Sequence, residues 1–106
     1  MTKPISEEFR VAAKEWVQIS SAADLLEECK SATLSEMMQK YVSAGDTSVS
    51  KAEMLAKSSE EWKTYVRGMV AARKDANMAK VKVDWIKMRH SEQMSDQANN
   101  RAEMKI

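Results

Sequence analysis

Apolar residues in the second half of the chain recur at alternating spacings of three and four residues. Together they form one seam, which comprises Trp62, Tyr65, Met69, Ala72, Ala76, Ala79, Val83 and Ile86. This heptad spacing predicts a single long helix with an apolar edge. The alanines would let another helix approach closely, so we expect the seam to be hidden by other helices. We expect a second chain to cover this edge, so that the protein self-associates along the seam, most simply as a symmetric dimer.

A polar segment divides the chain. Residues 43–50 are small and polar around Gly45, which can adopt the left-handed conformation that ends many helices. Ser50 and Glu53 then fit a capping box at the start of the next helix. The sequence predicts helices over residues 6–42 and 51–104, with a loop over residues 43–50.

Serine and threonine residues predict shorter interruptions within both halves. Ser20 and Ser21 could end one helix and cap another, and Thr33 with Glu36 fits a second capping box, so breaks are expected near residues 20 and 32. Ser58 offers a further restart near residue 58. The predicted fold is all-α: a helical hairpin or bundle with a broken N-terminal half and one long C-terminal helix. We expect coiled-coil-like packing within a single domain of residues 1–106.

The composition agrees with a helical protein and excludes several classes. Two Gly and one Pro in 106 residues are too few for the turns of a β-sandwich. The single cysteine, Cys29, excludes an intramolecular disulfide, and one Cys with one His excludes the usual zinc sites. No apolar run reaches the ~18 residues of a membrane span, and the N-terminus lacks a signal-peptide core. A cytoplasmic protein without membrane contact is expected.

The sequence contains no arrangement typical of catalysis. His90 lies far along the chain from Cys29, and Lys87 stands where a Glu-x-x-His metal motif would need glutamate. Gly45 and Gly68 are isolated, so no glycine-rich phosphate loop is present. We therefore expect no catalytic residues, no bound metal, no cofactor and no enzyme activity.

Basic residues gather beside the C-terminal part of the seam, although the net charge is only +1. This basic strip consists, with one aromatic residue, of Arg73, Lys74, Lys80, Lys82, Trp85, Lys87 and Arg89. Parallel self-pairing of the seam would oppose like charges from Lys80 onward. An antiparallel return of the acidic first half would instead supply opposite charges, from Glu15, Asp24, Glu27 and Glu28.

The strip has three interpretations. It could be a solvated or internally paired face, a nucleic-acid site in which Trp85 stacks on a base, or a protein-binding face. The methionines have two interpretations: they line an adaptable binding groove, or they fill the core. The residues in question are Met37, Met38, Met69, Met78, Met88 and Met94. Met88 and Met94 lie beyond the regular seam and are the better candidates for binding.

Several helical segments resemble small uncharacterised proteins of phages and prophages. They are residues 69–74 (MVAARK), 81–89 (VKVDWIKMR), 101–104, 50–54 and 23–28. The resemblance implies a phage accessory protein in the cytoplasm of a bacterial host. Such a protein would bind and modulate a host or phage protein of nucleic-acid metabolism or defence. Direct nucleic-acid binding and a structural coiled-coil spacer are the alternatives.

Overall fold

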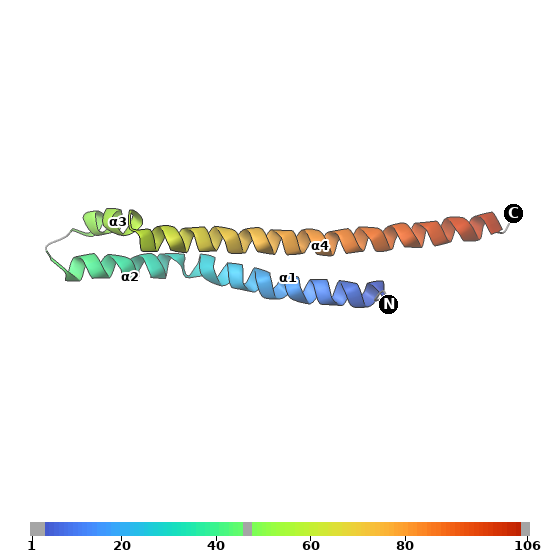
Figure 1. Cartoon of the computed structure of the whole chain (residues 1–106), viewed down its shortest axis with the longest axis horizontal. Helices are drawn as coiled ribbons and strands as arrows, with labels where there is room; N and C mark the ends of the chain where they lie inside the picture. Colours follow the sequence, from blue (N-terminus) through green and yellow to red (C-terminus); the bar gives the residue numbers. More distant parts are fainter. Residues whose placement is uncertain (1–3, 46–47, 105–106) are drawn as a thin grey trace.

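In the part of the chain that the structure describes, four helices form an elongated hairpin (Figure 1). The computed structural model describes residues 4–45 and 48–104, and this part contains no strand. The helices are α1 (Ile5–Glu28), α2 (Lys30–Ser43), α3 (Val49–Lys57) and α4 (Glu60–Met104). The predicted all-α fold with one long C-terminal helix is thus confirmed. The molecule measures 86 × 23 × 17 Å, and α4 with its 45 residues accounts for ~67 Å of that length.

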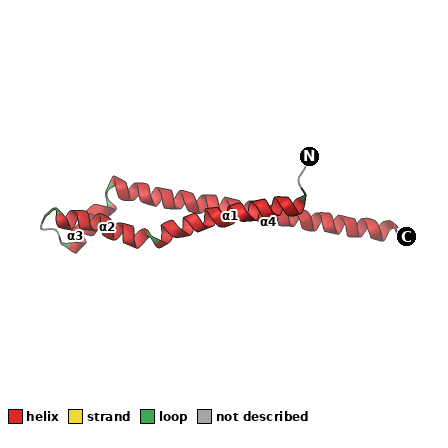
Figure 2. Cartoon of the chain, turned by 90° about the horizontal axis from the view of Figure 1, so that it is seen from below, coloured by secondary structure: helices red, strands yellow, loops and turns green. Residues whose placement is uncertain are grey.

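The first half of the chain returns along the second half. α1 packs antiparallel on α4, and α2 packs on α3 (Figure 2). Met37 of α2 also belongs to one apolar cluster with Trp62 at the start of α4. On α4 the seam residues Trp62, Ala76, Val83 and Ile86 are buried, and Tyr65, Met69, Ala72 and Ala79 are half-buried. The chain's own helices therefore hide the seam, and self-association through it would require the hairpin to open.

The core is thin and consists of two apolar clusters joined by alanines. Near the start of α1, Ala12 packs with Val83 and Ile86. At the other end, Met37, Ala56 and Trp62 bring α2, α3 and α4 together. Between the clusters, Ala23 is 0% and Ala76 1% exposed. A methyl side chain fills little space, so the two long helices lie close together along this stretch.

The first half breaks at Cys29, three residues before the break expected near residue 32, and the helix is continuous near residue 20, where the other break was expected. The Ser20 hydroxyl donates to the carbonyl of Val17 at 3.2 Å, so this serine is satisfied inside α1 and starts no new helix. Cys29 keeps near-helical angles (φ −82°, ψ −2°) and makes no side-chain cap. The change of direction is therefore shallow, and Thr33 lies inside α2.

The helix ends in the middle of the chain also differ from the expected ones. Ser48, rather than Ser50, caps α3, because its hydroxyl accepts from the Lys51 N–H at 3.3 Å. No described glycine has a positive φ, so Gly45 does not adopt the left-handed conformation. Ser59 accepts from the Trp62 N–H at 3.2 Å and caps α4, close to the expected restart. Residues 46 and 47 of the expected loop lie outside the described residues.

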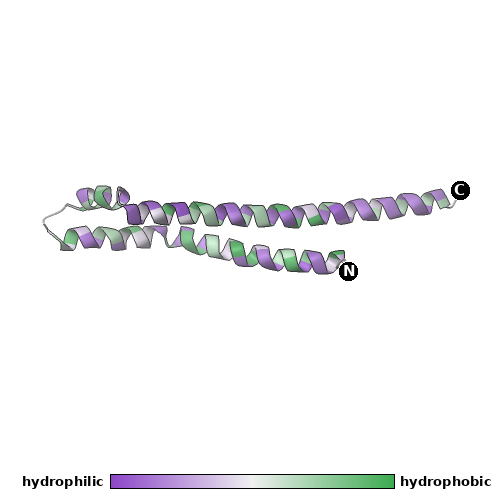
Figure 3. Cartoon of the chain, viewed as in Figure 1, coloured by the Kyte–Doolittle hydropathy of each residue, from purple (hydrophilic) through white to green (hydrophobic). Residues whose placement is uncertain are grey.

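The C-terminal end of α4 projects beyond α1 (Figure 1). Residues 92–104 are all exposed; we call them the overhang. Along α4, apolar and polar turns alternate rather than forming one long apolar block (Figure 3). Within residues 4–45 and 48–104, no helix is both long and apolar enough to cross a bilayer.

Candidate interaction surface on the long helix

The basic strip begins with Arg73, which is paired with acids of α1. Its Nη2 lies 2.5 Å from Oδ1 of Asp24, and its Nε donates to Oε1 of Glu27 at 3.0 Å. These hydrogen bonds lower the pKa of the Glu27 carboxyl and raise the pKa of the Arg73 guanidinium further above its usual value. Arg73 thus holds the last turns of α1 against α4.

Two further ion pairs continue along the same two helices. Arg89 Nη2 pairs with Oε2 of Glu8, and Lys82 Nζ lies 3.8 Å from Oε2 of Glu15. Glu8 and Glu15 are seven residues apart, as are Lys82 and Arg89 in the opposite chain direction. This is the register of an antiparallel heptad pairing. The sequence had suggested Glu15, Asp24 and Glu27 as partners of the strip but not Glu8.

The aromatic contacts of the strip are also largely internal. The Arg89 guanidinium lies over the Trp85 ring, 4.8 Å from its centroid, and Lys87 Nζ lies 5.7 Å from the centroid of Phe9. Both geometries permit cation–π attraction. Arg89 Nε is buried and has no hydrogen-bond partner in the described part of the chain. Arg89 therefore joins Glu8 of α1 to the exposed ring of Trp85.

The strip is consequently divided rather than continuous. Lys74 and Lys80 are exposed, and neither makes an ion pair with a described residue. The acidic candidate Glu28 is likewise exposed and pairs with none of the described basic residues. Most of the basic charge selected from the sequence is thus engaged by the chain's own acids and aromatic rings.

A second apolar line runs along α4 on the side away from the seam. We call it the outer stripe; its members are Met78, Val81, Trp85 and Met88, which are 61%, 60%, 52% and 54% exposed. Their spacings are three, four and three residues, so they share one helical face. The sequence reasoning missed this stripe as a unit, because it considered the methionines singly and Trp85 as a stacking residue. The repeated spacing was the available signal.

The methionines considered for a binding groove fall into two groups. Met37 is buried, and Met38 and Met69 are half-buried, so these three fill the core. Met78 and Met88 belong to the outer stripe, while Met94 is 55% exposed on the overhang. Only the second group is accessible to another molecule.

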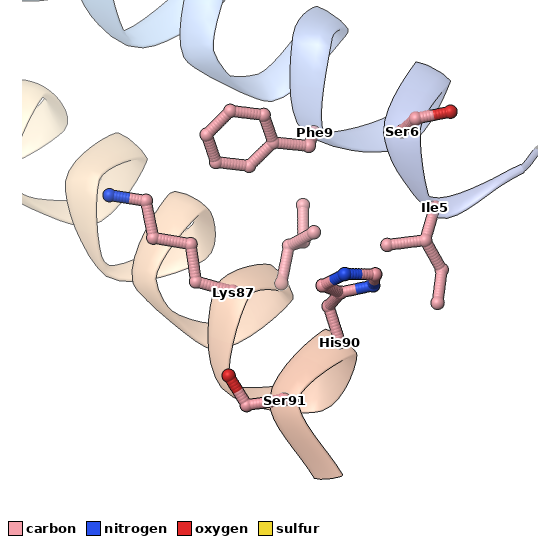
Figure 4. A pocket seen from close by; sticks show the side chains of 7 residues that line it. Ile5, Ser6, Phe9, Lys87, His90 and Ser91 are labelled. Carbon is pink, nitrogen blue, oxygen red and sulfur yellow. The ribbon is translucent and has the colours of Figure 1, made fainter. Parts of the chain in front are cut away.

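A groove of about 490 Å³ lies where the start of α1 meets α4. Ile5 and Phe9 from α1 and His90 from α4 face the same space (Figure 4). Ile86 forms part of its apolar wall, and Lys87 lies at its side. The lining includes no carboxylate and no thiol, and its two hydroxyl groups belong to Ser6 and Ser91. Neither serine makes a hydrogen bond with His90 in the described part of the chain, so no nucleophile–base pair is formed there.

The described residues also contain no cluster of three or more His, Cys, Asp or Glu side chains able to hold a metal ion.

Comparison with protein families, curated proteins and solved structures found no match. The outer stripe, with the exposed Lys74 beside it, is the candidate functional surface of the described part of the chain.

Proposed function

We propose that this chain is a non-enzymatic helical accessory protein that acts by binding another polypeptide through the outer stripe of α4. Its resemblance to phage and prophage proteins supports a role in the cytoplasm of a bacterial host. There it would modulate a host or phage protein of nucleic-acid metabolism or defence.

The exposed outer stripe is the observation that carries this proposal. Every one of its four large apolar side chains is more than half exposed, although α4 already buries a complete seam on its other side. Contiguous apolar surface of more than a few hundred Å² is unusual on a monomer and marks interaction sites. Tryptophan contributes strongly to protein interfaces, and methionine repacks readily against a partner.

A photo-crosslinking amino acid at position 81 tests the proposal in bacterial cells. Val81 lies in the middle of the outer stripe, so covalent adducts with a polypeptide are expected there. The matched control is position 17 on α1, because Val17 is equally exposed, at 57%, but lies outside the stripe. Adducts at position 17 alone, or at neither position, would contradict protein binding through α4. A passive coiled-coil spacer predicts no adduct at either position.

Direct nucleic-acid binding is the second candidate, and the exposed Lys74 and Lys80 favour it. Two lysines neutralise few phosphates, whereas Arg73, Lys82 and Arg89 already pair with carboxylates. A mobility-shift titration across a salt series separates the two functions, because phosphate binding weakens steeply as salt rises. The first proposal predicts no shift at low salt. A salt-sensitive shift would instead support nucleic-acid binding if the double variant Lys74→Gln/Lys80→Gln abolished it. The control variant Lys14→Gln on α1 should leave that shift in place.

A further inference from the structure

The outer stripe is symmetrical about Val83. Met78 and Met88 lie five residues to either side of this position, and Val81 and Trp85 lie two residues to either side. The positions of the large apolar side chains are therefore the same in both chain directions, although Val81 and Trp85 differ in size. From this symmetry and the charges that flank it, we infer that the polypeptide covering the stripe is a second copy of this chain, packed antiparallel. The inference rests on the proposed function: the polypeptide that the stripe binds is a second copy, and the dimer so formed is the species that would modulate a host or phage protein.

A twofold axis near Val83 brings the two stripes into register. Met78 of one copy then meets Met88 of the other, and Val81 meets Trp85 of the other, each contact occurring twice. This is the isologous arrangement of a symmetric dimer. Layers that pair a large ring with a smaller branched side chain also fit the spacing of antiparallel helices better than ring against ring.

The charges at the ends of the stripe specify the antiparallel direction. Lys74 and Glu92 each lie nine residues from Val83, and both continue the three–four spacing of the stripe. Both side chains are exposed, and neither has an ion-pair partner among the described residues. Antiparallel packing places Lys74 of each copy beside Glu92 of the other. Parallel packing would place lysine against lysine and glutamate against glutamate.

One of the charges near the twofold axis is already compensated within each copy. Lys82 of each copy would approach its equivalent, but it is paired with Glu15 of its own α1. Asp84 lies on the other flank, one helical turn from both Lys80 and Lys87. The repulsion between the two Lys82 side chains is thus reduced by Glu15 of the same chain, whereas Asp84 has lysines one turn away but makes no ion pair with a described residue.

The same packing covers the overhang. With the axis near Val83, residues 92–104 of one copy lie beside residues 62–74 of the other. The face of α4 available there carries Thr64, Arg67 and Ala71, all exposed, and the overhang offers Ser95 and Ala102 toward it. A contact ~60 Å long and about 10 Å wide would bury on the order of 600 Å² per copy, close to the ~800 Å² of a standard interface.

Sedimentation equilibrium of the full chain and its variants tests the inference. The wild-type chain of 12.0 kDa is expected to sediment as a dimer in the micromolar range, with a Kd of about 10 µM or lower. Val81→Lys should render it monomeric, because a charge would be buried at the centre of the interface. Its helix content by circular dichroism should stay unchanged, since lysine favours helix at least as well as valine. Val17→Lys on α1 is the matched control and should remain dimeric.

Charge reversal tests the direction of packing. Lys74→Glu and Glu92→Lys should each weaken the dimer by about tenfold, because both ion pairs become repulsive. The double variant should restore the wild-type Kd. Within one chain these residues are ~27 Å apart, so restoration can only arise between copies.

Four outcomes would overturn the inference. They are a wild-type chain that stays monomeric up to ~100 µM, a dimer that survives Val81→Lys, single charge variants that dimerise like wild type, and a double variant that stays weak. A monomeric chain that still forms crosslinks to another protein at position 81 would contradict the antiparallel dimer but agree with the proposed function. Absence of any adduct at position 81 would contradict both the dimer and the proposed function.

Discussion

The hydroxyl of Tyr65 on α4 donates a hydrogen bond to the main-chain carbonyl of Leu26 in the last turn of α1. Carbonyls in the last turn of a helix have no partner within that helix, so the tyrosine satisfies one of them. The Tyr65 ring also stacks on Trp62, with centroids 5.7 Å apart and planes at 13°. Tyr65 thus joins the end of α1 to the start of α4, next to the change of direction at Cys29.

Removing this hydroxyl should weaken the hairpin. Tyr65→Phe leaves the half-buried Leu26 carbonyl without its donor, and we expect the free energy of unfolding to fall by about 1 kcal/mol. Urea denaturation followed by circular dichroism measures the change. Tyr41→Phe is the control, because the Tyr41 ring is half-buried but its hydroxyl makes no hydrogen bond with a described residue. Equal losses in both variants would show that the hydrogen bond from Tyr65 to Leu26 does not stabilise the hairpin.

The alanine contact between the long helices should not tolerate a larger side chain. Ala23 is 0% exposed and lies where α1 passes the seam of α4. Ala23→Leu would push the helices apart, and we expect a loss of about 1–3 kcal/mol of unfolding free energy. Ala22→Leu, at the exposed neighbouring position, should leave stability nearly unchanged. A stable Ala23→Leu variant would mean that α1 and α4 are not in close contact there.

Much of this architecture is legible in the amino-acid sequence because it depends on periodicity. The spacing from Trp62 to Ile86 identifies the buried side of α4, since a heptad repeat keeps one edge facing a neighbouring helix. Opposite charges at heptad separation, such as Glu15 and Lys82, likewise suggest the antiparallel return. These features are local or repeat regularly along the chain, so they can be predicted from the sequence without the structure.

Features that depend on which of two hydrogen bonds a side chain makes cannot be predicted from the sequence in the same way. Ser20 and Ser48 both have hydroxyls suited to capping, yet Ser20 bonds back to Val17 inside α1, whereas Ser48 caps α3. The outer stripe was missed for a different reason: its residues were considered singly, so the spacing of three and four residues that they share was not recognised.

Gly68 is a removable weakness in α4. It lies within the helix without a positive φ, and a Cβ added there would meet nothing within 4 Å. Gly68→Ala should therefore raise the free energy of unfolding by about 0.5–1 kcal/mol, because alanine loses less backbone entropy on forming a helix. Thermal unfolding measures the gain. The opposite change at an exposed site of α1, Ala22→Gly, should cost a similar amount. A destabilised Gly68→Ala variant would indicate that another molecule approaches the helix at this position.

The Arg73–Glu27 pair should make stability depend on pH in a defined direction. Hydrogen bonds from Arg73, opposed by partial burial, lower the pKa of Glu27 in the folded chain. Above the ordinary glutamate pKa of about 4.3, Glu27 is ionised in both states and the pair contributes in full. As the pH falls, the unfolded chain takes up the proton first, so the contribution declines and ends once folded Glu27 is also protonated.

Arg73→Met should therefore destabilise the chain near neutral pH and by progressively less below the ordinary glutamate pKa. It should also move the Glu27 carboxyl titration, followed by NMR, upward toward its usual range. Arg67→Met is the matched control, because Arg67 is an exposed arginine of α4 without an ion pair to a described residue, and its effect should be small at every pH. If Arg73→Met destabilised the chain equally at neutral and acid pH, the arginine would act through the packing of its methylene groups rather than through its charge.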